Sequence, residues 1–313
     1  MNQNKQLKLF EKNNDVDIEM KAIEIIRYFE PVALKMDSRG YCVTVSWGKD
    51  SMANLRLFIK AGVKFFVQWN ITGIDPPELT YFGRQQAYSL ELQGYKVVLV
   101  YPQKPMCKMI VDHCTPPTAM MRYCCDELKE KVVRDHQNCL FSYGVRWEES
   151  PSRSNGRETM EVVSKSKKNI RLFNDNSENR RQFEVCIAKG IKALNPIISW
   201  TTEQIWEYHK EEKLPYCHLY DCGFNRLGCV GCPLAYKENR EFEFKMYPRF
   251  RNYYMTAFKR MVEERKRRNI DKNRIAAGKK PMPFDTAENV WKWWLERKEL
   301  PIYDPSQGEL DFC

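Results

Sequence analysis

A regular alternation of strand-like and helix-like segments constrains the fold of this chain more than any other feature of its sequence. Tyr41–Trp47 is rich in β-branched and aromatic residues, a glycine-containing loop follows it, and Ser51–Lys60 then has its apolar residues on one helical face. Further strands are predicted at Val63–Trp69, Tyr95–Tyr101 and Cys139–Val145, and a further helix at Pro77–Leu92. Because strands that are separated by helices pair in parallel, the pattern predicts an α/β fold, a parallel sheet with helices on both faces.

Beyond Leu214 the alternation stops and the pattern becomes helical. From about Arg249 to Asn269, apolar side chains recur at intervals of three and four, which predicts a helix with one buried stripe. A last helix is expected at Ala287–Lys298, and we interpret its three tryptophans as core or domain-docking residues. Ser150–Arg181 is polar with weak periodicity, so we interpret it as a long exposed loop.

Composition narrows the class of protein. Hydrophobic residues make up 43% and charged residues 29% of the chain, which favours a sizeable core over disorder. No segment of about 18 residues lacks a charge, and no apolar run opens the sequence, so we expect a cytoplasmic protein with neither a membrane-spanning helix nor a secretory signal. The 51 basic and 41 acidic residues give a net charge of +10, which favours an anionic partner such as nucleic acid or a phosphate-rich small molecule.

The loop Ser46–Ser51 has the composition of a phosphate-binding turn. It joins a predicted strand to a predicted helix, where backbone amides are exposed, Gly48 allows close approach, serine hydroxyls add donors and Lys49 adds a cation. The Gly-x4-Gly-Lys spacing of a Walker loop is missing. On the pattern alone, an ordinary strand-to-helix turn capped by an Asp or Ser explains the loop equally well.

Twelve cysteines are many for a chain that we expect in a reducing compartment, where clustered thiols more often bind metal or do redox chemistry. Two pairs stand out, the adjacent Cys124 and Cys125, and Cys229-x-x-Cys232. Thiolates suit both zinc and iron–sulfur centres, so two such pairs can converge on one site. An adjacent pair is unusual for zinc, and a zinc site could take Cys222 and His218 as substitute ligands. The alternative is that these thiols are buried and pack as small hydrophobic groups.

Five segments resemble, in the same order, motifs of the PP-loop superfamily of ATP pyrophosphatases and adenylyl-sulfate reductases. They are Ser46-x-Gly48-Lys49-Asp50-Ser51; Thr72-Gly73-Ile74 with Pro77–Thr80; Gly144-Val145-Arg146 with Glu149, Ser150 and Arg153; Asn195–Thr201 with Ile205–Tyr208; and Leu214–Tyr216 with Leu219, Tyr220, Gly223 and Gly228-Cys229-x-x-Cys232. The similarity covers about residues 41–233 and is to phosphoadenosine phosphosulfate (PAPS) reductase-like proteins. It implies an adenine nucleotide α-hydrolase-like, Rossmann-like fold with a C-terminal cysteine loop and helical extension.

The resemblance also implies which residues form the sites. The nucleotide, ATP or adenylyl sulfate, would be bound by Ser46, Gly48, Lys49, Asp50, Ser51, Thr72, Gly73, Gly144 and Arg146. Of these we expect three to be catalytic: Lys49 and Arg146 would offset the charge of pyrophosphate, and Asp50 would orient a magnesium ion or the loop itself. In the cluster-bearing reductases, a Cys-Cys pair and a Cys-x-x-Cys pair hold a 4Fe–4S cluster, which implies that role for Cys124, Cys125, Cys229 and Cys232, with zinc as the alternative.

Two features depart from the reductases of activated sulfate. Those enzymes usually have a degenerate loop, whereas this chain keeps Gly-Lys-Asp-Ser intact, as in the branch that splits ATP between its α and β phosphates. Their Glu-Cys-Gly-(Ile or Leu)-His tail is also missing, although Cys313 stands at the end of the chain as a candidate nucleophile. We expect three regions: a helical lead-in at 1–40, a PP-loop nucleotide-binding domain at 41–215, and a cysteine loop with a basic helical region at 216–313.

Basic residues concentrate between Lys259 and Lys280, where ten stand against three acidic ones. A solvated helix face with Glu263–Arg267 and Glu264–Arg268 pairs would neutralise two of the ten. The rest are candidates for contacting the phosphates of a nucleic acid, in particular Arg265, Lys266, Lys272, Arg274, Lys279 and Lys280.

These features favour an enzyme that uses ATP to adenylate an oxygen of DNA or tRNA. Sulfur from a donor such as a cysteine desulfurase or thioredoxin would then displace AMP. A second hypothesis is reduction of adenylyl sulfate or PAPS to sulfite, and a third is a nucleic-acid-binding regulator that has kept a nucleotide fold. Assembly into a homo-oligomer stays open for all three.

Overall fold

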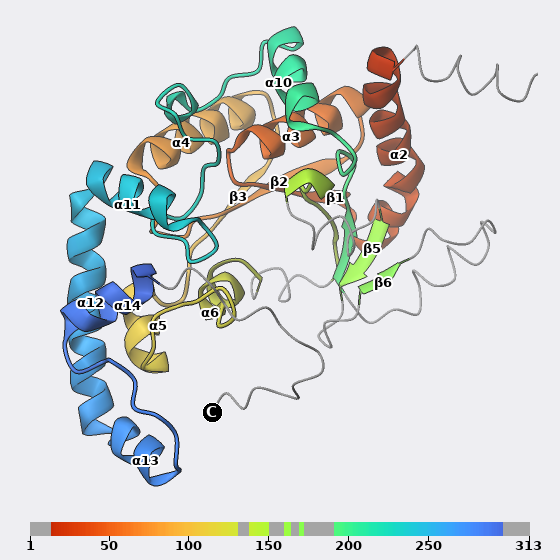
Figure 1. Cartoon of the computed structure of the whole chain (residues 1–313). Coiled ribbons are helices and arrows are strands. Elements are labelled where there is room, and N and C mark those ends of the chain that lie inside the picture. The colour runs from red at the N-terminus through yellow and green to blue at the C-terminus, as the bar shows by residue number, and fades with distance from the viewer. Residues whose placement is uncertain (1–13, 131–137, 150–159, 164–168, 172–190, 297–313) are drawn as a thin grey trace, which may run out of the picture. The chain divides into compact units, whose positions relative to one another are not determined.

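The computed structural model describes residues 14–130, 138–149, 160–163, 169–171 and 191–296, which form two compact units (Figure 1). The first unit comprises Met1–Ile71, Pro77–Tyr101 and Glu130–Leu227, and the second comprises Thr72–Pro76, Pro102–Lys129 and Gly228–Cys313. This division differs from the three predicted regions, because two segments from within 41–215 pack with the C-terminal helices.

The first unit is built on a sheet with the strand order β3-β2-β1-β4-β7-β5-β6. Five of its strands are parallel: β1 (Tyr41–Val45), β2 (Phe65–Asn70), β3 (Val97–Val100), β4 (Leu140–Ser142) and β7 (Ile191–Leu194). In the centre of the sheet, Val43 of β1 lies opposite Val67 on one side and Ser142 on the other. The prediction of an α/β fold with a parallel sheet is confirmed, and β1 to β4 lie where the sequence predicts strands, whereas β7 was not predicted.

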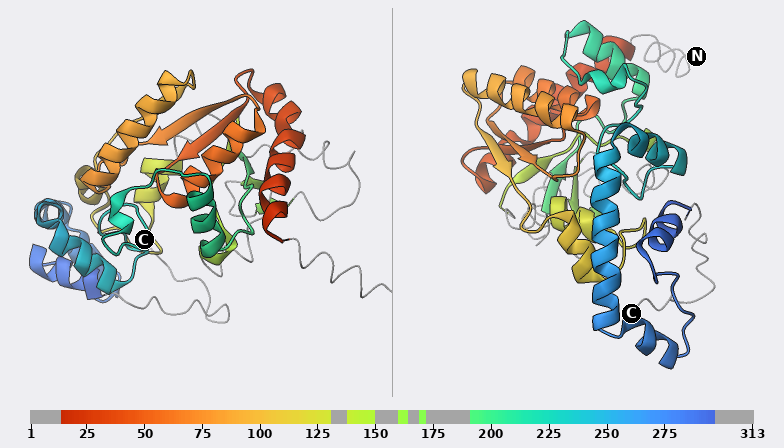
Figure 2. Two further views of the ribbon diagram at one scale, coloured as in Figure 1. Left: turned by 90° about the horizontal axis from the view of Figure 1, so that it is seen from above. Right: turned by 90° about the vertical axis from the view of Figure 1, so that its left-hand side faces the viewer.

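Four helices of the first unit connect or flank these strands: α2 (Asn14–Met36), α3 (Lys49–Ala61), α4 (Pro77–Leu92) and α10 (Thr202–Glu211) (Figures 1 and 2). Helix α3 is capped at its C-terminus by Gly62, whose φ of 68° places it in the left-handed region that glycine tolerates. Helix α10 begins with a capping box, in which the side chains of Thr201 and Gln204 each accept a hydrogen bond from the other's backbone amide. Among the described residues, no helix combines the length and apolar content that crossing a bilayer requires.

The segment Ser150–Arg181, predicted as a long exposed loop, contains two short strands. These are β5 (Met160–Val163) and β6 (Asn169–Arg171), which pair antiparallel with each other, while β5 also pairs antiparallel with β7. Backbone hydrogen bonds hold such a pair of edge strands together, so it needs no apolar pattern in the sequence. The prediction was wrong for these seven residues, and the rest of the segment lies outside the described residues.

The second unit is helical, and its longest helix is α12 (Pro248–Arg267), blue in the right-hand view of Figure 2. The helices around it are α5 (Met106–His113), α11 (Lys237–Met246), α13 (Ile270–Ala276) and α14 (Ala287–Glu296). The predicted stripe of α12 is confirmed by the burial of Tyr254, Ala257, Phe258, Met261 and Val262. The ring of Trp294 lies 4.8 Å from that of Tyr254 and 5.3 Å from that of Phe258, so this tryptophan is a core residue, as predicted.

Candidate nucleotide site and cysteine centre

The loops that follow β1 and β4 meet at the switch point of the sheet. Strands β2 and β3 lie on one side of β1, and β4 and β7 lie on the other, so the direction of the crossovers reverses between β1 and β4. In open α/β sheets, ligands bind outside the carboxyl ends of the strands at this point. A Cβ on Gly144, two residues after β4, would lie only 2.8 Å from the carbonyl oxygen of Asp50. Glycine therefore permits two of the predicted nucleotide-binding segments to touch.

The phosphate loop itself is a tight, internally bonded turn. Trp47 has a φ of 60°, which is uncommon for a residue with a side chain, and it is fully buried. Its ring packs against Gly83 of α4, where a Cβ would come within 2.3 Å of the indole. The Ser51 hydroxyl donates to the carbonyl of Gly48 at 2.9 Å and accepts from the amide of Ser46 at 3.3 Å. Packing and hydrogen bonds thus fix the turn in which the predicted phosphate-binding residues lie.

Three charged side chains of the predicted site form one buried group. The Asp50 carboxylate accepts from the Lys49 ammonium at 3.0 Å through Oδ2 and from Arg146 Nε at 2.6 Å through Oδ1. Lys49 is 7% exposed and Arg146 is 2% exposed, so both cations are held away from water. Both oxygens of Asp50 already accept hydrogen bonds from cations. Of the two roles predicted for Asp50, this arrangement favours orienting the loop over binding a magnesium ion.

Arg146 uses its remaining N–H groups inside the protein. Nη1 donates to Glu148 at 2.7 Å and to the carbonyl of Trp200 at 3.2 Å, and Nη2 donates to the Thr202 hydroxyl at 3.2 Å. Hydrogen bonds from Thr202, and then from Arg146, lower the pKa of Glu148. Arg146 therefore ties Asp50 to the start of α10, a positioning role that sequence reasoning missed. The only signal for it was the capped helix start at Thr201.

A tyrosine hydroxyl accepts the hydrogen bond of the first backbone amide of α3. The Lys49 N–H donates to Tyr220 Oη at 3.0 Å. Tyr220 lies on a short 3-10 helix, His218–Tyr220, its ring packs edge-on against Trp206, and burial raises its pKa. The sequence motif includes Tyr220 but does not predict this contact. Because a phosphate oxygen would need this same amide, the hydroxyl has to give way before the helix start can bind a nucleotide at Lys49.

His209 contacts the backbone of the phosphate loop. It is buried on α10, and its Nε2 lies 2.8 Å from the carbonyl oxygen of Lys49. Burial lowers the pKa of the imidazole, so the ring is neutral at physiological pH. The contact gives His209 a structural role, and its Nδ1 is buried without a hydrogen-bond partner within the described residues.

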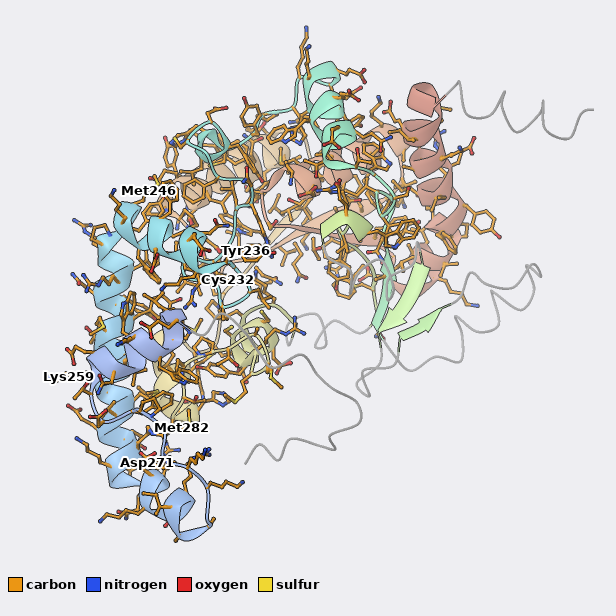
Figure 3. All side chains as sticks on the ribbon, viewed as in Figure 1. Cys232, Tyr236, Met246, Lys259, Asp271 and Met282 are labelled. Carbon is orange, nitrogen blue, oxygen red and sulfur yellow. The ribbon has the colours of Figure 1, made fainter. Side chains whose placement is uncertain are left out.

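The four predicted metal-binding cysteines all belong to the second unit. Cys229 and Cys232 form a tight turn in which the Cys232 amide donates to the Cys229 carbonyl at 3.2 Å. Gly231 makes the turn possible, since its φ is 73° and a Cβ there would lie 2.4 Å from the ring of Phe244. Figure 3 shows Cys232 just before α11. Cys222, a substitute ligand, is exposed and belongs to the first unit.

The thiols of these cysteines act on one another. A hydrogen bond with Cys125 raises the pKa of the buried Cys124, and burial and the charges of Cys125, Cys229 and Cys232 raise it further. Burial raises the pKa of Cys229 to about 12, against the opposing effect of Lys129. The four sulfurs therefore share one neighbourhood.

The structure does not place these thiols as ligands of a single metal ion. Among the described residues, no three His, Cys, Asp or Glu side chains are placed to hold one metal ion. Tetrahedral zinc requires sulfurs about 3.8 Å apart, as follows from a Zn–S bond of about 2.3 Å. The thiolates of a 4Fe–4S cluster each bind a different iron and stand further apart. Four cysteine thiols are, by their chemistry, the kind of donor set that such a cluster takes.

The structure corrects one of the predicted nucleic-acid-binding residues. Arg265 is 5% exposed, forms an ion pair with Asp271 and donates to the carbonyl of Cys114, because its side chain turns into the core beside Phe284. It is therefore not available to a polyanion. Figure 3 shows Lys259 and Asp271 along this part of the unit.

The other predicted cations are more accessible. Lys266 and Lys280 are exposed, whereas Arg274 and Lys279 are half-buried, and Arg274 Nε donates to the Lys280 carbonyl at 2.6 Å. The predicted Glu264–Arg268 pair forms at 2.6 Å. Arg267 pairs with Glu264, at 2.6 Å, instead of with Glu263 as predicted. Residues three apart on a helix are neighbours as much as residues four apart, so one glutamate serves both arginines.

The fold and the site define an α/β protein with a glycine-containing loop at the switch point of a parallel sheet. A family model of the phosphoadenosine phosphosulfate reductase domain matches residues 40–235, more than half of the chain. The chain belongs to this family, as its motifs predict, and is a member of the PP-loop superfamily.

Similar proteins include an uncharacterized protein of Methanocaldococcus jannaschii, 26% identical over 269 residues that cover 82% of this chain and 46% of that protein. An adenosine 5′-phosphosulfate reductase of Oceanobacillus iheyensis is 32% identical over 83 residues, 26% of this chain and 30% of that enzyme. The match thus spans less than half the length of either relative.

Among solved structures, the PAPS reductase of Candida auris in a phosphate complex has a TM-score of 0.44 at 16% identity and covers 73% of this chain and 96% of that chain. The U34-tRNA thiolase of Methanococcus maripaludis with its [4Fe-4S] cluster has a TM-score of 0.41 at 12% identity and covers 78% of this chain and 79% of that one.

Proposed function

We propose that this chain is an ATP-dependent sulfur-transfer enzyme of the PAPS reductase family, which activates an oxygen of a nucleic acid and replaces it with sulfur. The observation that carries the proposal is the buried Lys49–Asp50–Arg146 group at the start of α3, in an intact loop beside Gly144. The name of the Oceanobacillus relative, adenosine 5′-phosphosulfate reductase, supports an adenine nucleotide as the ligand of this loop.

In the first step, an oxygen of the acceptor attacks the α-phosphorus of ATP. The bond from this phosphorus to the bridging oxygen breaks, and pyrophosphate leaves. Negative charge grows on the departing pyrophosphate, so amides of the helix start and the Lys49 ammonium stabilise the transition state. Asp50 holds that ammonium at 3.0 Å and Arg146 holds Asp50, so the cation needs little reorganisation during the reaction.

In the second step, hydrosulfide attacks the atom that carries the activated oxygen. A bond to sulfur forms, the bond to oxygen breaks, and AMP leaves with that oxygen, so nothing is oxidised or reduced. The hydrosulfide would come from a desulfurase persulfide that a thiol reductant such as thioredoxin cleaves. Cys124, Cys125, Cys229 and Cys232 would hold a 4Fe–4S cluster, which when bound supplies iron at which sulfide can be held.

The proposed acceptor is DNA or tRNA. Exposed cations at Lys266, Arg267, Lys272 and Lys280 stand on α12, on α13 and beyond it. With Arg265 paired internally, the segment Lys259–Lys280 still has an excess of basic over acidic residues, and such clusters bind phosphates with strong salt dependence.

ATP–pyrophosphate exchange by the anaerobically purified protein tests the proposal. We expect exchange in the presence of the acceptor nucleic acid, and its loss in Lys49→Met, which keeps the length of the side chain but removes the charge. Lys60→Met is the matched control on the same helix, because Lys60 pairs with Glu212 at the other end of α3. Thioredoxin-dependent release of sulfite from adenylyl sulfate or PAPS, without exchange, would refute the proposal in favour of a reductase. Salt-sensitive binding of nucleic acid, with no ATP–pyrophosphate exchange in the presence of any DNA or RNA, would refute the proposal in favour of a regulator.

A further inference from the structure

An arginine next to the cysteine turn is buried without enough hydrogen-bond partners. Arg240, on α11, is 3% exposed. Its Nη1 donates to the carbonyl of Trp294 at 2.8 Å, and its guanidinium lies over the Trp294 ring at 4.1 Å. Its Nε and Nη2 are buried, and within the described part of the chain neither has a hydrogen-bond partner. A buried guanidinium needs both charge compensation and hydrogen-bond acceptors, and this one lacks acceptors for two of its three nitrogens.

The groups around Arg240 indicate what the missing partner is. Glu243 lies three residues further along α11, and Tyr254 packs against the same Trp294 ring, with the ring centres 4.8 Å apart. Tyr254 donates its hydroxyl to the carbonyl of Val230 at 3.0 Å, and Glu243 accepts from the amide of Gly231 at 2.6 Å. Both residues thus hold the Cys229–Cys232 turn. Four thiols that become thiolates on binding metal would add a net negative charge to this neighbourhood.

We propose that Arg240 is a positioning residue of the four-cysteine centre: its buried Nε–H and Nη2–H groups donate to the metal-bound sulfurs and offset the charge of the centre. This inference rests on the cluster in the proposed function. It assigns to Arg240 a role that the family motifs do not contain, since Arg240 lies beyond the end of the matched region, 40–235.

The physical consequence is a coupling between Arg240 and the centre. A cluster becomes more negative on reduction, so a buried cation beside it stabilises the reduced form and raises the midpoint potential. The same cation is unfavourable while the thiols are protonated and uncharged, since its charge is then uncompensated. Loading the centre should therefore stabilise the protein more when residue 240 is positive.

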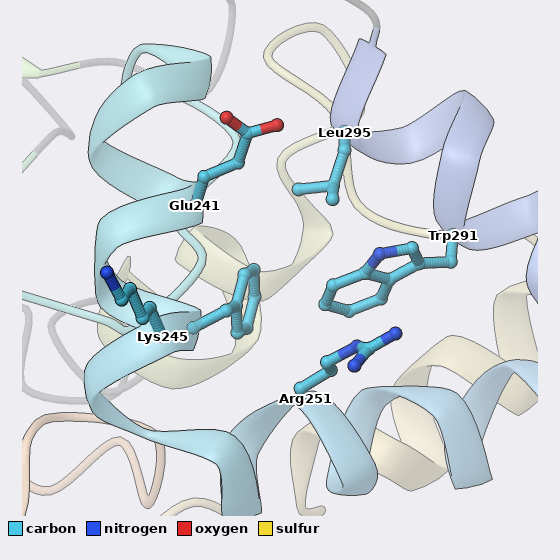
Figure 4. A pocket seen from close by; sticks show the side chains of 6 residues that line it. Glu241, Lys245, Arg251, Trp291 and Leu295 are labelled. Atoms are coloured by element: carbon cyan, nitrogen blue, oxygen red, sulfur yellow. The ribbon is translucent and has the colours of Figure 1, made fainter.

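The experiment compares the full-length wild-type protein with Arg240→Met, Arg240→Lys and Arg251→Met, each loaded anaerobically with iron and sulfide. Arg251→Met is the matched control, because Arg251 also lies over a tryptophan of α14, Trp291 at 5.7 Å, but it lines the pocket of Figure 4 with Glu241. Three quantities are measured: the rate of cluster loss to a chelator, the midpoint potential, and the rise in unfolding temperature on loading.

We expect Arg240→Met to lose the cluster about tenfold faster or more, as is typical for partners of metal ligands. Its midpoint potential should be lower and its stabilisation on loading smaller, Arg240→Lys should recover part of both, and Arg251→Met should match the wild type. A purely structural role would shift the loaded and metal-free forms equally and leave the potential unchanged, and that result would overturn the proposal. If the wild type takes up neither iron and sulfide nor zinc, the cluster of the proposed function is wrong and the role of Arg240 is wrong with it. If the wild type loads and Arg240→Met behaves identically, only the role of Arg240 is wrong.

Discussion

Replacing Tyr220 by Phe should strengthen the binding of ATP. The substitution keeps the ring, which packs against Trp206 at 5.1 Å, and removes only the hydroxyl that accepts from the Lys49 amide at 3.0 Å. A hydrogen bond between neutral groups contributes about 1 kcal/mol net, and the nucleotide has to break this one before its phosphate can use the amide. Without that competition, the affinity should rise by a factor of about 5, since about 1.4 kcal/mol corresponds to a factor of ten. The nucleotide-free protein should lose about the same 1 kcal/mol of stability.

Titration calorimetry with ATP, pyrophosphate and adenosine tests this reasoning. The gain should occur with ATP and pyrophosphate and be absent with adenosine, which has no phosphate. Tyr216→Phe is the matched control: Tyr216 lies in the same aromatic cluster, but its hydroxyl donates to Asp221 at 3.2 Å. Weaker binding by Tyr220→Phe, with Tyr216→Phe unchanged, would mean that the hydroxyl is a ligand of the phosphate, and the competition argument would be wrong.

Three further predictions concern the loop and its supports. Asp50→Asn leaves Lys49 and Arg146 buried without their shared counter-charge, so urea unfolding should show a loss of about 3 kcal/mol, and a loss near zero would mean that the group is not coupled. Gly144→Ala should cost about 1–3 kcal/mol and weaken ATP binding, because the new Cβ meets the backbone of Asp50 at 2.8 Å, whereas Gly228→Ala, with no atom within 4 Å of the added carbon, should change stability little. The pKa of Glu148 is lowered from 4.5, so its stabilising contribution is present above that value and lost as the pH falls through the lowered pKa; Glu148→Gln should therefore lose less stability than the wild type between about pH 5 and 3 in thermal unfolding.

Much of the sheet was predictable, because its strands are buried and separated by helices with clear ends. Tyr41–Val45 is a continuous apolar or β-branched run, Phe65–Asn70 is apolar apart from Gln68 and Asn70, and Gly62 stops the helix between them. The antiparallel pairing of Met160–Val163 with Asn169–Arg171 was not predictable, since pairing at the edge of a sheet uses backbone groups that every sequence has. The membership of Thr72–Pro76 in the helical unit was not predictable either. That segment is held there by contacts such as the Val230 amide with the Ile74 carbonyl, at 2.8 Å, between residues far apart in the sequence.

The sequence predicted which residues form the phosphate loop, but it did not predict their contacts. The order of the motifs predicts that Lys49, Asp50 and Arg146 belong to one nucleotide site. The switch point of the sheet explains why the loops after β1 and β4 meet. The sequence cannot show that Arg146 spends its donors on Asp50, Glu148 and Thr202, or that Tyr220 caps Lys49. Each of these contacts depends on which side chain fills a particular space once the chain has folded.

Arginine shows most clearly where counting charges along a sequence fails. Arg265 adds to the basic excess of α12, yet it is buried and paired with Asp271, so it contributes nothing to a surface for nucleic acid. Arg240 stands outside every predicted site, yet it is a buried cation on α11, the helix whose Glu243 contacts the cysteine turn. Both residues lie on amphipathic helices, and the face on which an arginine falls is decided by its neighbours in three dimensions. Burial changes what a charged side chain can bind. An exposed cation is screened by solvent and can bind any phosphate, whereas a buried cation must be compensated by a specific anion. The partner that we propose for Arg240 is therefore a stronger constraint on what this protein binds than the exposed lysines at 266 and 280.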